Sequence, residues 1–145
     1  MYKRVVVPLD GSPRAEAILP FVERMAGPLG AEVVLVRVEP PASWEVLDLL
    51  PAMAEDELMA RREEAQQYLR TWVRALGRRG LRVDLVVRVG EPPEEIVVCA
   101  REIGADLIAM TTRGHGGLRR MLTGSTADAV LRSASVPVLL LSPPP

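Results

Sequence analysis

Short runs of branched apolar residues alternate along the chain with stretches in which apolar residues recur every three or four positions. The runs are nearly continuous in valine, isoleucine and leucine, as is typical of strands buried on both faces of a parallel sheet. The pattern predicts five strands, at Arg4–Leu9, Val33–Val38, Arg82–Val89, Asp106–Thr111 and Val136–Leu141.

Four helices are predicted between these strands, because the intervening apolar residues repeat with helical spacing. Ser12 and Pro13 have the order of a helix cap followed by a first-turn proline, and Gly80 and Gly104 suit helix ends. The alternation predicts an α/β fold, in which an open parallel sheet carries helices on both faces. The apolar repeats run through Ala15–Ala26, Leu58–Leu76, Ile96–Ile103 and Ala127–Ala134.

Two segments fall outside this alternation. The connection 40–57 is too long for a simple turn between a strand and a helix. Connections of this length are commonly functional lids or poorly ordered insertions, so a lid is one expectation for it. The proline tail at 143–145 is expected to fray.

Length and composition limit the remaining choices. A chain of 145 residues suits a single domain covering 1–145. A net charge of −1 and an aromatic content of 3% argue against a nucleic-acid partner. No apolar run approaches the roughly 18 residues of a membrane span, and no signal-peptide pattern precedes the first strand. We therefore expect a cytoplasmic protein without a membrane partner, and a buried, inert thiol at Cys99.

The segment from Thr111 to Ser125 contains four glycines and three arginines between a strand and a helix. Glycines at a helix N-terminus suit a backbone that approaches a phosphate closely. A glycine-rich connector explains the same residues, since Ser125 and Asp128 have the spacing of a capping box. The segment lacks the Gly-Lys-Ser/Thr of a Walker A loop and the last glycine of a dinucleotide fingerprint. Its spacing alone leaves the phosphate site and the connector open.

The whole chain resembles the universal stress protein family. Nucleotide-binding members carry the motif G-x2-G-x9-G-[ST] after the fourth strand, and here Gly114 takes the second glycine while Gly124 and Ser125 close the motif. Thr111 occupies the first glycine position, which is a departure from the pattern. The start of the chain, Val5 to Ser12, and its end, Val136 to Leu141, are similar to the family's first and last strands, whereas Arg37 replaces a histidine that is commoner in the second.

This resemblance implies a Rossmann-like fold of the adenine nucleotide alpha hydrolase-like type, with strand order 3-2-1-4-5. It also implies a homodimer formed through Val136–Leu141 and a bound adenine nucleotide, ATP with or without Mg²⁺. The protein would then act as a dimeric stress-response sensor or regulator. The nucleotide-binding residues carried over from the family motifs are Pro8, Asp10, Val38, Met110, Thr111, Gly114, Gly124, Ser125 and Thr126.

Thr111 leaves the strength of nucleotide binding open. Its branched side chain would crowd the ribose in a close-packed site, or its hydroxyl would hydrogen-bond the sugar. A dimeric scaffold of the same fold with an empty site is therefore an alternative function. Slow ATP hydrolysis is another, although no general base, nucleophile or metal-ligand cluster is identifiable and His115 is the only histidine. No catalytic or metal-binding residue is assigned.

Overall fold

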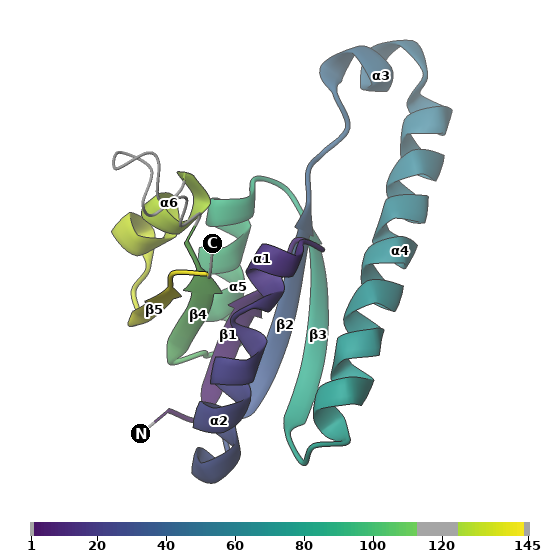
Figure 1. The fold of residues 1–145 in the computed structure, drawn as a ribbon. Coiled ribbons are helices and arrows are strands. Elements are labelled where there is room, and N and C mark those ends of the chain that lie inside the picture. The colour runs from purple at the N-terminus through teal and green to yellow at the C-terminus, as the bar shows by residue number, and fades with distance from the viewer. Residues whose placement is uncertain (1, 113–124, 144–145) are drawn as a thin grey trace.

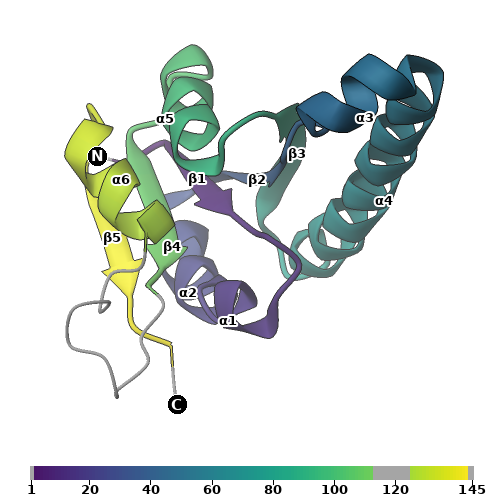
Figure 2. The ribbon, with the colours of Figure 1, turned by 90° about the horizontal axis from the view of Figure 1, so that it is seen from above.

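The computed structural model describes residues 2–112 and 125–143. In these ranges five parallel strands form one sheet in the order β3-β2-β1-β4-β5, which confirms the predicted fold class and strand order. The helices cover both faces of this sheet (Figures 1 and 2). The strands are β1 (Arg4–Pro8), β2 (Glu32–Glu39), β3 (Arg82–Val89), β4 (Leu107–Thr111) and β5 (Val138–Leu141).

The helices differ from the prediction mainly in number. The first predicted helix is divided into α1 and α2, and the segment before the second contains an additional short helix, α3. Helix α2 ends at Gly30, whose φ of 64° is a left-handed conformation that glycine adopts without a steric penalty. The helices are α1 (Pro13–Glu16), α2 (Leu19–Leu29), α3 (Trp44–Leu49), α4 (Pro51–Gly77), α5 (Pro92–Glu102) and α6 (Ser125–Ser133).

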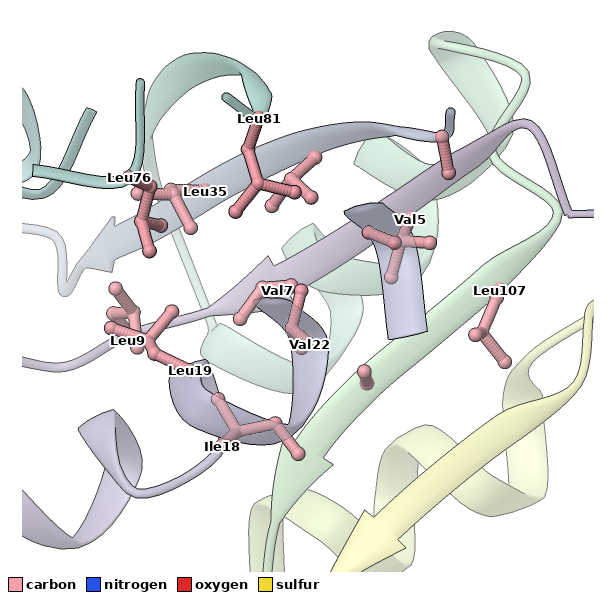
Figure 3. Packing of buried hydrophobic residues seen from close by; sticks show 14 of the residues in the cluster. Val5, Val7, Leu9, Ile18, Leu19, Val22, Leu35, Leu76, Leu81 and Leu107 are labelled. Atoms are coloured by element: carbon pink, nitrogen blue, oxygen red, sulfur yellow. The ribbon is translucent and has the colours of Figure 1, made fainter. Parts of the chain in front are cut away.

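Successive residues of the central strands point to opposite faces of the sheet, so their side chains contribute to two separate hydrophobic cores. Val5 and Val7 of β1 pack with α2 and α4 in one core (Figure 3), while Val6 packs with α5 and α6 in the other. Each fully buried branched side chain contributes about 1.5–3 kcal/mol through removal from water. Cys99 lies in the second core with no exposed surface, and burial raises the pKa of its thiol, so the predicted inert thiol fits its surroundings.

The connection 40–57 is helical rather than an irregular insertion. The Ser43 hydroxyl accepts a hydrogen bond from the Val46 amide and caps α3, and Pro51 occupies the first turn of α4. Helix α4 therefore begins seven residues before Leu58, where the apolar repeat was first recognised. Figure 1 shows α3 and the first half of α4 extending beyond the end of the sheet.

Helix α4 is long but polar. Within the two described ranges, no helix combines the length and the apolar character needed to cross a membrane. Near the C-terminus, Pro143 is buried, and positions 144 and 145 of the proline tail lie outside the described residues.

Candidate functional site

A pocket of about 190 Å³ opens at the carboxyl ends of β1, β2 and β4. Strand β1 lies between β2 and β4, and the chain reverses its direction of travel across the sheet at this point. In open α/β sheets, ligands bind outside the carboxyl ends of strands at such a switch point. The position of the pocket therefore agrees with the general rule for this architecture.

One wall of the pocket is the turn that joins β1 to α1. Asp10 Oδ1 accepts hydrogen bonds from the Ser12 amide at 2.9 Å and from the Ser12 hydroxyl at 2.6 Å. The same hydroxyl accepts from the Ala15 amide at 3.2 Å and caps α1. Gly11 has a φ of 88°, which suits glycine, and an added Cβ there would lie 3.2 Å from the Arg37 guanidinium. These contacts hold the Asp10 carboxylate at the pocket wall.

The opposite wall is apolar. Val36 and Val38 of β2 face the same core as α5, and Met110 ends the buried part of β4. Pro92 and Ile96 from the start of α5 complete this surface. A wall of branched and thioether side chains can pack against a flat heteroaromatic ring and exclude water from it.

Hydroxyl groups gather where β4 ends and α6 begins. Thr111, Thr112 and Thr126 all line the pocket. Thr112 is 8% exposed, and among residues 2–112 and 125–143 its buried Oγ1 atom has no hydrogen-bond partner. A buried hydroxyl in this state carries a desolvation penalty, which a polar ligand or water reaching that atom would relieve.

Positive charge also reaches the pocket. Arg14, on α1, is half-buried and belongs to the lining. The N-terminus of α6 adds backbone N–H groups and the positive end of a helix dipole. Together these features favour an anionic group at the side of the pocket bounded by α1 and α6.

The pocket brings together six of the nine candidate residues: Pro8, Asp10, Val38, Met110, Thr111 and Thr126. Ser125 is the first residue of α6, and its side chain is not described. Gly114 and Gly124 lie outside the described residues, as do the three arginines of the glycine segment and His115.

Two polar lining residues, Thr112 and Arg14, are not among the candidates identified from the sequence. The family motif has a glycine at the position of Thr111 and assigns no role to Thr112, although a hydroxyl at the end of a buried strand is a usable signal. Arg14 follows Asp10 by about one helical turn, and that spacing could have placed it at the same strand end.

Arg37, the residue that departs from the family's usual histidine, faces away from the apolar wall. Alternation along β2 directs Val36 and Val38 to one face and Arg37 to the other. Its guanidinium pairs with Glu39 at 2.9 Å and lies 5.0 Å from the centre of the Tyr68 ring. In the described structure this residue therefore connects β2 to α4.

Metal binding has little support from protein side chains. Across residues 2–112 and 125–143, no three histidine, cysteine or carboxylate side chains are grouped so that they could hold an ion.

The fold and the pocket define an open α/β protein with a pocket at the switch point of its sheet. The family model described as "Universal stress protein family" matches residues 1–142, and the chain belongs to that family. This assignment confirms the resemblance found in the sequence.

Three similar proteins illustrate the relationship. The universal stress protein MJ0531 of Methanocaldococcus jannaschii is 33% identical, with 99% of this chain and 84% of that protein covered. The solved structure of MJ0577 from the same organism superposes with a TM-score of 0.83 at 29% identity, covering 97% and 96% of the two chains. A universal stress protein from Archaeoglobus fulgidus, solved in complex with dAMP, gives a TM-score of 0.67 at 28% identity, covering 96% and 97%.

Proposed function

We propose that this protein binds ATP or a related adenine nucleotide in the switch-point pocket and acts in the cytoplasm as a dimeric stress-response sensor or regulator. The observation that carries the proposal is the composition of one pocket. An anchored carboxylate, an apolar wall, a buried unpartnered hydroxyl and a helix N-terminus all line it. The dAMP complex of the similar Archaeoglobus fulgidus protein supports an adenine nucleotide as the ligand.

The pocket suggests how the parts of a nucleotide are distributed. The Asp10 carboxylate would accept a hydrogen bond from a ribose hydroxyl or an exocyclic amine. The backbone of Val38 would meet the adenine edge, while Met110 and Thr111 would lie beside the sugar. Pro8 would flank the adenosine from the end of β1. These assignments place the base against the apolar wall.

The phosphates would lie toward α6. Thr126 and the backbone amides of the first turn of α6 supply neutral donors there, and Arg14 supplies charge. Ser125, Gly114 and Gly124 are assigned to the same phosphates on the family motif. This assignment gives no lining residue the role of a general base or nucleophile. We therefore propose nucleotide binding without dedicated catalysis.

The direct test is to identify what the purified protein carries. Protein purified without added nucleotide is denatured, and the released small molecules are examined by ultraviolet spectrum and mass. An adenine spectrum with the mass of ATP or a related nucleotide supports the proposal. Protein that releases nothing, and that also fails to bind added ATP, would instead support the empty scaffold.

The empty scaffold remains the second candidate because of Thr111. This residue ends β4, is half-buried and lines the pocket, so its side chain occupies space that a glycine would leave open. If the protein is an empty scaffold, it should form the same dimer in solution but bind no nucleotide.

We also propose a homodimer built on residues 136–141. β5 is paired with β4 on one side and forms the end of the sheet, and its four residues are half-buried. An apolar strand at a sheet edge can pair with a second copy of itself across a two-fold axis. Val136 and Pro137 precede the strand and would complete this interface.

A further inference from the structure

Helices α3 and α4 form an arm that extends beyond the sheet, as Figure 1 shows. Helix α4 has 27 residues and is therefore about 40 Å long. Its second half packs on the first core through Leu69 and Leu76. In its first half Ala54 is buried, and Met53 and Met59 are exposed.

The base of the arm is fixed by polar contacts. Arg61 donates to the Pro40 carbonyl at 2.9 Å and lies 3.9 Å from the Glu39 carboxylate. The Tyr68 hydroxyl donates to the Glu16 carboxylate on α1. Burial, followed by this hydrogen bond, raises the pKa of Tyr68, so the hydroxyl stays protonated as a donor at neutral pH. The arm is thus held in a defined direction while its end remains in solvent.

The end of the arm exposes an unusual amount of apolar surface. Monomeric proteins rarely leave large apolar side chains grouped in water, and such groups commonly mark interaction sites. Two of the exposed apolar residues at the end of the arm are methionines, whose flexible side chains adapt to varied partners. We call this group the apolar tip; it consists of Trp44 (81% exposed), Leu47 (41%), Leu49 (78%), Leu50 (51%), Met53 (62%) and Met59 (65%).

All of the apolar tip except Trp44 lies within an acidic stretch. From Val46 to Glu64 the sequence has six acidic and two basic residues, a formal charge of −4. One of the two bases, Arg61, is already engaged with Glu39. The acidic side chains are all exposed: Asp48, Glu55, Asp56, Glu57, Glu63 and Glu64.

We propose that the apolar tip is a docking surface for a basic amphipathic helix of a partner protein. The apolar face of such a helix would cover the tryptophan, leucines and methionines, while its lysines or arginines would meet the surrounding carboxylates. A second copy docking tip to tip would bring two charges of −4 together, and anionic membranes and nucleic acids would be repelled in the same way. The proposal does not depend on nucleotide binding.

Trp44 provides the test. The chain has two tryptophans, and Trp72 packs against the first core, so Trp72→Phe leaves Trp44 as the only indole. The probe is a synthetic amphipathic helix of leucine and lysine with its leucines at i, i+3, i+4 and i+7. We expect a saturable blue shift of Trp44 emission with this peptide. No shift is expected with a peptide in which glutamate replaces every lysine.

Variants separate the tip from the rest of the surface. Leu47→Ser combined with Met53→Ser should lower the affinity for the lysine peptide at least about tenfold, because both substitutions remove apolar contact area. Asp56→Lys combined with Glu57→Lys should lower this affinity by a similar factor. The affinity of the wild-type protein for the lysine peptide should also fall as the salt concentration increases. Leu29→Ser, which changes an apolar residue 40% exposed on α2, and Glu94→Lys, an exposed charge on α5, serve as matched controls.

Three results would overturn the proposal. The first is equal binding of the lysine and glutamate peptides, and the second is unchanged affinity in both tip variants. The third is a blue shift that grows with protein concentration in the absence of peptide, since that would make the tip a contact between copies of this chain. Circular dichroism of each variant confirms that the helices are retained.

Discussion

Asp10 and Ser12 form a closed pair in which one carboxylate oxygen accepts from both the amide and the hydroxyl of the serine, at 2.9 and 2.6 Å. Because the same hydroxyl caps α1 through the Ala15 amide, the wall of the pocket and the start of the helix depend on one side chain. We therefore expect the stability of α1 and the proposed nucleotide binding to be linked at this turn.

Ser12→Ala tests that link. Loss of the cap should lower the free energy of unfolding by about 1 kcal/mol. The Asp10 carboxylate would lose one of its two partners, so nucleotide affinity should fall as well. Urea unfolding and calorimetric titration measure the two effects separately.

Ser43→Ala is the matched control, because Ser43 caps α3 in the same way but lies in the arm. We expect a smaller loss of stability and no change in nucleotide affinity. If Ser12→Ala behaved like Ser43→Ala in both measurements, the turn would have no special role in the pocket.

Thr112→Val removes the buried hydroxyl while keeping the shape of the side chain. Since Oγ1 has no hydrogen-bond partner within the described part of the chain, the nucleotide-free variant should be more stable by about 1 kcal/mol. If the nucleotide satisfies this hydroxyl, the same variant should bind ATP more weakly. Thermal unfolding with and without ATP shows both changes, and a destabilised nucleotide-free variant would mean that the hydroxyl already has a partner.

Thr111→Gly tests the departure from the family motif. Removal of the branched side chain should tighten ATP binding if that side chain crowds the ribose. Thr111→Val keeps the volume and removes the hydroxyl, so on the crowding account its affinity should match wild type. Weaker binding by both variants would instead identify the hydroxyl as a contact to the sugar.

Leu139→Lys tests the proposed dimer. The substitution places two like charges near the two-fold axis and should shift the protein toward monomer in light scattering. Leu139 also packs against the first core, so circular dichroism must show that the fold is kept. Leu131→Lys, at an exposed residue of α6, is the control, and a wild-type monomer at micromolar concentration would refute the interface.

Much of the fold could be predicted from the sequence, because buried parallel strands need continuous apolar runs. β3 was predicted with its observed bounds, and β1 and β4 each differ by one residue. β5 begins at Val138 rather than Val136, and Pro137, which has no N–H to donate, contributes only its carbonyl oxygen to Ile108. The local pattern of apolar residues is therefore sufficient to predict such strands.

The arm and part of the pocket could not be predicted in this way. Before Leu58 only Ala54 of α4 is buried, so packing against the core imposes little apolar patterning on the first turns of this helix. Arg14 and Thr112 reach the pocket only because the fold brings α1 and the end of β4 together. Sequence signals can place such residues at strand ends, but which of them meet in one pocket depends on tertiary contacts.

Calorimetric titration of nucleotide-stripped protein with ATP tests the central claim most directly. Wild type should bind about one ATP per chain, and Asp10→Asn should bind at least about tenfold more weakly, because it replaces a charged hydrogen-bond acceptor with a neutral one. Asp84→Asn, which changes an exposed aspartate on β3, should match wild type. Absence of binding heat in stripped wild type, or equal affinity in all three proteins, would contradict ATP binding at this pocket.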